Sequence, residues 1–413
     1  MPLLLLLALV VMGWLLIERE SEVYFRAQEL SLWLPTHHFY ETSIIYPGGT
    51  LTWAAAYMTQ FFFHPWVGVV LMMLFWAVIM GLTCRLLQLR GVWQGLSLLV
   101  PMCLLTCLVQ MGYWLYYMKL QGHLWVPTLG VFLALVLAMP VRHITSRRVR
   151  LAWMALAGIL GYPLMGAWSF LALALMLLSL HDRPLKEILW ETGLALLLVV
   201  AVPFIMAQQF YGQVEMKSAH LAAMPSFRYG VTNCQEYRWA YFALAASFVL
   251  CVLPHYIFRN EASAKRNRGN ERLPWKEVLF VLLFIGLGAF GIHKRWYRDT
   301  NFHKEVAMTN AIHELDWERV LHVMLSQDMG EPMPPTRVMV MMKNLALFRL
   351  GRAGDEMFRY PEGAEQQHAP WQVKMTQVGG KLLYFNYGKE GFCYRWCMED
   401  GVEYGWSVEK LKL

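Results

Sequence analysis

The sequence predicts an all-α protein in two parts: a polytopic membrane helix bundle of about nine spans in residues 1–292, and a small extracytoplasmic helical-hairpin domain in residues 293–413. Of the 413 residues, 57% are hydrophobic and 16% are charged, whereas soluble domains are about 45–50% apolar and about a quarter charged. Long uncharged runs fill the chain up to residue 292 and then stop. The seven cysteines, an odd number spread over a long chain, do not form the pattern of a disulfide-rich secreted protein.

The membrane spans are predicted from uncharged runs, because a bilayer core about 30 Å thick needs roughly 20 apolar residues in a helix. These runs cover residues 2–17, 65–83, 92–111, 124–141, 151–180, 188–207, 240–258 and 278–292. The run 151–180 is too long for one upright crossing, and Gly161, Pro163 and Gly166 in its middle are residues that turn a chain. We therefore expect two short crossings that meet near Met165, which gives nine spans.

Charge asymmetry predicts the orientation of the chain. Nine spans with a cytoplasmic N-terminus place 14 Lys and Arg in the 43 residues of the inner loops, and 6 in the 94 residues of the outer loops. Because Lys and Arg are retained in cytoplasmic loops, residues 293–413 are expected outside the cytoplasm. The basic loop 259–277 is then a topology determinant, and no nucleic-acid partner is expected.

The predicted spans contain little that could support ion transport, which needs carboxylate, His or Lys side chains inside the bundle. Glu191 is the single Asp, Glu, Lys or Arg within them, and its place near one end of a span predicts an interfacial side chain. Cys103 and Cys107 are expected to pack as small hydrophobic residues. Polar chemistry is therefore expected in the outer loops or in residues 293–413.

The largest outer loop, residues 18–64, carries the candidate catalytic residues Glu29 and Glu41. A carboxylate at the membrane surface can act as a general base or bind a divalent cation, and the alternative is a solvated interfacial charge. No other cofactor is evident, and the adjacent pair His37-His38 lacks the spacing of a metal site. After the turn at 47–50, apolar residues recur at helical spacing, which predicts a helix in the membrane interface. The expected substrate-binding residues lie on and after this helix and are Trp53, Tyr57, Gln60 and His64.

Residues 293–413 are predicted to form helical hairpins. Apolar residues recur at helical spacing in 301–326 and 336–358, and a Gly- and Pro-rich segment at 330–335 separates the two. The segments 316–321 and 344–351 are similar to the two halves of a tetratricopeptide-like helix pair, although no clean 34-residue repeat can be placed. Since residues 409–413 continue a helical pattern to the last residue, we expect an unusually short array or one that is truncated.

The membrane part resembles the plan of the GT-C glycosyltransferases, integral-membrane enzymes that use polyprenyl-phosphate sugars. Glu29, Glu41 and the segments 46–66 and 161–175 carry this resemblance. It implies that an acid beyond the first helix deprotonates or positions an acceptor while the lipid phosphate leaves. Such enzymes usually place an Asp in this loop, and residues 18–64 contain none. Over nearly all its length the chain also resembles an uncharacterised family of bacterial multi-pass membrane proteins, through PGG…TQFF and NLALFRLGRAGDEMF. This resemblance implies that the chain lies in a bacterial inner membrane.

Two functions follow as hypotheses, and whether the protein is an enzyme stays open between them. In the first it is a GT-C-like lipid-linked glycosyltransferase, or an inactive relative, with membrane lipid and a polyprenyl-phosphate sugar as its partners. In the second it is a non-enzymatic envelope scaffold or assembly factor that docks another envelope protein through residues 293–413. The large number of spans favours the first, whereas the missing Asp and the apolar spans favour the second.

Overall fold

The computed structural model describes residues 2–180, 184–214, 216–226, 235–257, 275–326, 334–360 and 375–413, and the elements assigned in these ranges are helices. The first part contains α1 (Pro2–Glu29), α2 (His37–Ser43), α3 (Gly49–Thr59), η1 (Gln60–Phe63), α4 (Pro65–Leu86), η2 (Gly91–Leu98), α5 (Leu99–Val109), η3 (Gly112–Tyr117), α6 (Val126–Ala138), η4 (Met139–Arg142), α7 (Arg147–Met165), α8 (Trp168–Ser179), α9 (Leu185–Gln209), α10 (Met216–Ala219), α11 (Gln235–Ile257) and α13 (Trp275–Arg295). The C-terminal domain contains α14 (Thr300–His313), α15 (Trp317–Leu325), α16 (Arg337–Arg349), α17 (Ala353–Glu356), η7 (Met357–Arg359), α18 (Met375–Asn386), α19 (Glu390–Tyr404) and α20 (Val408–Lys412).

Several helices are long and apolar enough to cross a membrane, which is consistent with a membrane protein. In the part of the chain that the structure describes, five segments meet this criterion: Pro65–Leu86, Gly91–Val109, Glu187–Gln209, Tyr237–Pro254 and Trp275–Arg295. Two shorter apolar segments, Val126–Arg142 and Trp168–Ser179, lie among them. The all-helical class is thus confirmed, while the count of nine spans stays a prediction.

The long apolar run at 151–180 is broken where the sequence predicts it. Helix α7 ends at Met165 and α8 begins at Trp168, and Gly166 between them has a φ of 61°, in the left-handed region that favours glycine. A Cβ on Gly166 would lie 2.5 Å from the carbonyl oxygen of Ala222, so the backbones approach closely here. The Gly48 amide also donates to the Pro163 carbonyl at 2.9 Å. The two segments that carry the GT-C resemblance therefore pack against each other.

Three predictions about helix boundaries are wrong, and in one of them the stretch 336–358 divides into α16, which ends at Arg349, α17 and η7. Residues 18–29 belong to α1 and are not part of a loop, because one side of this stretch packs into the bundle through Tyr24 and Ala27. The stretch 301–326 is two helices and not one, because α14 ends at His313 and Leu315 has a φ of 59°. The side chain of Asp316 then caps α15 by accepting from the Arg319 amide at 3.0 Å.

The side chain of Glu191 is fully buried, which corrects the expectation that it reaches out of its span as a snorkelling side chain does. Its Oε1 accepts a hydrogen bond from Nε of Arg150 at 2.6 Å, and both side chains are 0% exposed. Glu187 binds the same guanidinium at 2.8 Å. The sequence places Arg150 in a loop, but α7 begins before Arg150 and packs along α9. The guanidinium of Arg150 therefore lies between these two helices.

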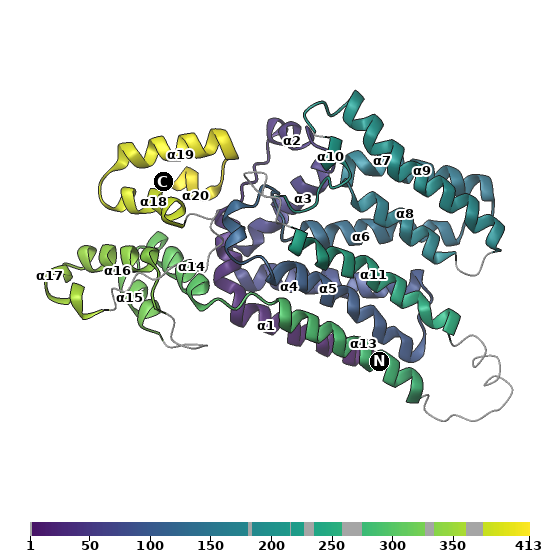
Figure 1. Ribbon diagram of the computed structural model, residues 1–413, viewed down its shortest axis with the longest axis horizontal. Coiled ribbons are helices and arrows are strands. Elements are labelled where there is room, and N and C mark those ends of the chain that lie inside the picture. Colours follow the sequence, from purple (N-terminus) through teal and green to yellow (C-terminus); the bar gives the residue numbers. More distant parts are fainter. Residues whose placement is uncertain are drawn as a thin grey trace.

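The C-terminal domain lies at one end of the bundle, beside the end of α1 (Figure 1). Its helices pack in succession, with α14 on α15, α15 on α16, α16 on α18, and α18 on α19. A separate apolar core fills this domain, and η3 of the first part contributes Tyr113, Trp114 and Tyr116 to it. The two parts therefore share a core at the junction, where α1 also passes.

Candidate functional site: the junction between α1 and the C-terminal domain

The second half of α1 presents a row of ionisable side chains to the C-terminal domain. Glu22, Arg26 and Glu29 are separated by four and three residues, which places them on one face of the helix. Glu20, two residues before Glu22, points to a different side of the helix. Each of the four side chains has a partner in residues 296–413, described below.

The first two acids hold the start of the domain. Glu20 accepts from the indole nitrogen of Trp296 at 2.6 Å, and the same oxygen lies 3.5 Å from Nε2 of His303. Glu22 accepts from the Asn310 side-chain amide at 2.8 Å and also pairs with the guanidinium of Arg319. These contacts bind α1 to α14 and α15.

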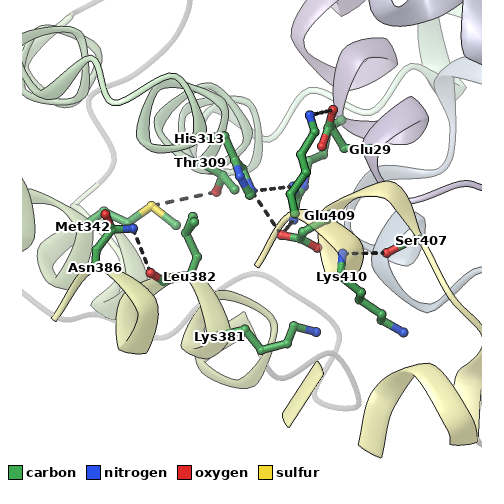
Figure 2. A network of polar contacts seen from close by, with 12 residues as sticks. Glu29, Thr309, His313, Met342, Lys381, Leu382, Asn386, Ser407, Glu409 and Lys410 are labelled. Atoms are coloured by element: carbon green, nitrogen blue, oxygen red, sulfur yellow. Dashed lines mark hydrogen bonds and ion pairs between the residues drawn. The ribbon is translucent and has the colours of Figure 1, made fainter. Parts of the chain in front are cut away.

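Arg26 lies at the centre of the junction and is 1% exposed. Its guanidinium donates to Oε1 of Glu409 at 2.6 Å, and Nε2 of His313 lies 3.2 Å from that oxygen. The guanidinium also lies over the ring of Tyr116, 5.5 Å from its centroid. Burial alone would raise the pKa of Glu409, but the charge of Arg26 and the hydrogen bond from His313 outweigh burial and hold that pKa well below its usual range. Figure 2 shows Glu409 and His313 pointing toward one another.

The last helix, α20, lies against the end of α1. Nζ of Lys412 binds Oε1 of Glu29 at 2.7 Å, and the Val408 amide donates to the Ser31 carbonyl at 3.1 Å. Lys410 donates to the backbone carbonyls of Asp400 and Gly405, which ties α20 to α19. Figure 2 shows the side chain of Lys410 pointing away from Glu409. The C-terminal segment is thus bonded to both the domain and the bundle.

A small polar cavity lies next to the junction. It has a volume of about 20 Å³, room for about one water molecule, and Ser31, Gln121 and His123 contribute polar atoms to its wall. The side-chain amide of Gln60 donates to Ser31 Oγ at 3.0 Å and that of Gln28 donates to Gln60 at 3.1 Å. Burial lowers the pKa of His123 to about 4, which keeps its ring neutral at pH 7.

The structure separates the two predicted catalytic acids. Glu29 is 1% exposed and bonded to Lys412, whereas Glu41 lies half exposed on α2, with Nδ1 of His37 at 3.3 Å and Nδ1 of His38 at 3.8 Å. Within the described ranges, no hydrogen bond or ion pair joins Glu29 to Glu41. Nor do these ranges contain a group of three or more His, Cys, Asp or Glu side chains placed to hold a metal ion. The catalytic role of Glu29 and Glu41 stays a prediction.

The four predicted substrate-binding residues fall into three places. Trp53 and Tyr57 flank the ring of Trp33, with centroids 5.6 and 4.7 Å away, and Tyr57 is exposed. Gln60 belongs to the polar chain beside the cavity. His64 is exposed between η1 and α4. Gln60 thus lies near Glu29, whose neighbour Gln28 it contacts.

Sequence reasoning missed Arg26, His313 and Glu409, which form the centre of the junction. The spacing of Glu22, Arg26 and Glu29 is a signal for a helical face and could have been found. The pairing of Arg26 with Glu409, 383 positions apart, has no local signal in the sequence.

The whole chain, residues 1–413, matches the model of one protein family. The chain belongs to the DUF6057 family. DUF6057 is described as a family of unknown function, which confirms the resemblance to an uncharacterised family. A search among curated proteins and solved structures finds no match to this chain.

Proposed function

We propose that this DUF6057 protein is a non-enzymatic membrane scaffold or assembly factor that holds its C-terminal domain in a fixed position for an envelope protein partner. The observation that supports this is the continuity of α1. Its first half is an uncharged apolar helix, and its second half bonds the C-terminal domain through Glu20, Glu22, Arg26 and Glu29. A domain held this way needs no ordering when a partner binds, so less free energy is lost on association.

The proposed topology has nine spans in an inner membrane, with the N-terminus in the cytoplasm. The first half of α1 and the helix α7 would cross the bilayer together with the five long apolar segments and the two shorter ones. The C-terminal domain, as a tetratricopeptide-like array of helical hairpins, then lies outside the cytoplasm. A cysteine placed at Val402 on α19, which is exposed, should react with a membrane-impermeant thiol reagent in intact cells; protection there would contradict this orientation.

The scaffold function is tested by photo-crosslinking in cells, with a photoreactive residue at Phe392 or Val402 on the exposed side of α19. We expect one discrete crosslinked envelope protein, lost in Arg26→Ala and retained in Arg395→Ala. Arg395 is the matched control because it pairs with Glu399 on the surface of the same domain, where both side chains are exposed. Crosslinks that are absent, or that are equal in the two variants, would overturn the proposal.

A second candidate is the GT-C-like glycosyltransferase, with membrane lipid and a polyprenyl-phosphate sugar as substrates and Glu29 or Glu41 as the acid. One observation favours it: buried Glu29 lies beside the polar chain of Gln28, Gln60 and Ser31 and the small cavity. Native mass spectrometry in mild detergent tests for a co-purifying polyprenyl-phosphate sugar. For an enzyme, Glu41→Gln or Glu29→Gln abolishes transfer at normal abundance; for a scaffold, Glu41→Gln changes nothing and Glu29→Gln weakens the contact with Lys412.

A further inference from the structure

The exposed apolar sides of α1 and α13 end at the same place in the molecule. The large exposed apolar side chains of α1 lie within residues 3–17, and those of α13 lie within 275–290. Both helices run toward the C-terminal domain (Figure 1). Just beyond the two apolar stretches, the indole nitrogen of Trp296 donates to Glu20 at 2.6 Å and joins their ends. Since α13 is long and apolar enough to cross a membrane, this place is expected at the level of the lipid headgroups.

Four exposed cationic side chains, here called the cationic rim, lie directly beyond these apolar stretches. They are Arg19 on α1, Lys294 and Arg295 in the last turn of α13, and Arg298 after it. Cζ of Arg19 lies over the ring of Trp296, 5.6 Å from its centroid. The cationic rim is therefore one surface built from two helices that are far apart in the sequence.

Acidic side chains do not neutralise the cationic rim. Among the exposed charged side chains of residues 18–20 and 293–298, four are cations and one, Glu18, is an acid. Glu20 is buried and accepts from an indole nitrogen, and Asp299 accepts from the first amides of α14. In the part of the chain that the structure describes, no ion pair joins a member of the cationic rim to an acid.

Arg298 donates to another basic side chain. Its guanidinium lies 2.6 Å from Nδ1 of His293, and because a guanidinium has no acceptor, the imidazole nitrogen must accept the bond. The donors of the cationic rim are thus directed at a neutral ring and at solvent, where a phosphate would offer several charged oxygens. Arg binds phosphate through two parallel hydrogen bonds, which are shorter and stronger than bonds to a neutral acceptor.

We propose that the cationic rim binds the phosphate of an anionic phospholipid, whose acyl chains lie along the exposed apolar sides of α1 and α13. Clusters of Lys and Arg directly beyond a membrane helix bind acidic headgroups, and each cation contributes separately. The apolar sides are continuous with the cationic rim, so that one lipid can contact both. Binding here requires that α13 crosses a membrane, in either orientation, and it is independent of the scaffold function.

Lys294 and Arg295 would have a second role without any lipid, because cations in the last turn of a helix stabilise its dipole. That role is confined to α13 and does not depend on the charge of a headgroup. Lipid binding depends on the headgroup and also on Arg19, which belongs to α1. The two roles are therefore separated by comparing lipids and by changing α1.

Photolabelling of the full-length protein in phosphatidylcholine nanodiscs tests the lipid site. The nanodiscs contain a trace of photoactivatable phosphatidylglycerol, which is anionic, or of photoactivatable phosphatidylcholine with the same chains, and labelled peptides are mapped by mass spectrometry. We expect residues 292–298 to be labelled at least thirtyfold more by the anionic lipid. Lys294→Gln/Arg295→Gln should lower this preference about thirtyfold. Lys389→Gln/Arg395→Gln, which removes the same charge from exposed positions of the C-terminal domain, should leave it unchanged.

A variant of α1 keeps the test decisive if the double variant of α13 does not fold. Arg19→Gln should lower the preference about fivefold, and Arg19→Lys, which keeps the charge, should retain it. Soluble glycerol phosphate at millimolar concentration should leave the labelling in place, because the acyl chains also hold the lipid; displacement would assign the site to a free phosphate and overturn the lipid. Equal labelling by the two lipids, equal preference in the two double variants, or an unchanged preference in Arg19→Gln would also overturn it.

Discussion

Arg26 and Arg150 are both fully buried, and each donates to a glutamate oxygen at 2.6 Å, yet they join very different parts of the chain. Arg150 binds Glu187 and Glu191 of α9, so it fixes two helices that lie next to each other in the bundle. Arg26 binds Glu409, 383 positions away, and fixes the C-terminal domain to α1. The same kind of buried Arg–Glu pair thus joins two helices within the bundle in one case, and the bundle to the C-terminal domain in the other.

The two sites differ in which contact is weakened when the arginine is removed. Removing one partner of a buried pair costs about 3–5 kcal/mol, because the other charge stays buried and unpaired. At Arg150 this cost falls on the packing of α7 against α9. At Arg26 it falls on the attachment of a whole domain, so the two changes should be told apart by where the structure opens.

The largest effect is expected for Arg26→Ala. Glu409 would remain buried with His313 as its near neighbour, and attachment of the domain should weaken by about 3–5 kcal/mol. Amide exchange in α14 and α20 should then accelerate a hundredfold or more, while Arg395→Ala leaves it unchanged. Equal exchange in the two variants would show that Arg26 does not hold the C-terminal domain to α1.

Arg150→Ala should have an effect at the lower end of the same range, because Glu187 is partly exposed and keeps its solvent. We expect a lower unfolding temperature of the detergent-solubilised protein and faster exchange in α7 and α9. Exchange in α20 should match the wild type. Faster exchange in α20 would mean that the two sites are coupled and would break the comparison.

Acid should release the junction through Glu409. Its pKa is lowered in the folded protein, so its stabilising contribution is present above the ordinary value of 4.5 and is lost as the pH falls further. Exchange in α20 should therefore rise on acidification from about pH 6 toward about pH 3.5, once intrinsic rates are removed. In Glu409→Gln, α20 should exchange faster already at pH 6, and exchange should no longer rise on acidification. If exchange still rises with acid in this variant, another group is responsible.

The smallest effect is expected for Lys412→Ala. Lys412 is 49% exposed and keeps part of its solvent, whereas Glu29 is 1% exposed and would lose its cation, so we expect a cost of about 1–2 kcal/mol, between a surface pair and a fully buried one. Exchange in α20 should rise by about five- to thirtyfold, below the change in Arg26→Ala. A rise in α20 exchange as large as that in Arg26→Ala would show that the domain is attached mainly through Glu29, at the end of α1.

Much of the architecture could be predicted from local sequence. Uncharged runs predict the apolar helices, and a glycine that must adopt a positive φ marks the break at Gly166. The extension of α1 could not be predicted in the same way. Its polar residues read as a loop, because the partners that make a helix favourable there, such as Arg319 and Glu409, come from the far end of the chain.

The candidate site was predictable only in part. The sequence indicates Glu29 as an acid just beyond the first apolar run, but its burial against Lys412 depends on the path of α20. The place of Glu191 near one end of its span predicts an interfacial side chain, and its burial follows from α7, which begins at Arg147 and brings Arg150 against α9. Single-sequence reasoning thus finds ionisable residues in unusual places, while their partners follow from tertiary packing.

The bonding of α1 to α20 also imposes an order on biosynthesis. Arg26 leaves the ribosome long before Glu409, and at about 5–20 residues per second the 383 positions between them take roughly 20–80 s to translate. The partners of Glu20 and Glu22 are synthesised first, from Trp296 to Arg319, whereas Arg26 and Glu29 wait for Glu409 and Lys412. A nascent chain of this protein therefore carries unpaired charged side chains on α1 until α20 has been synthesised.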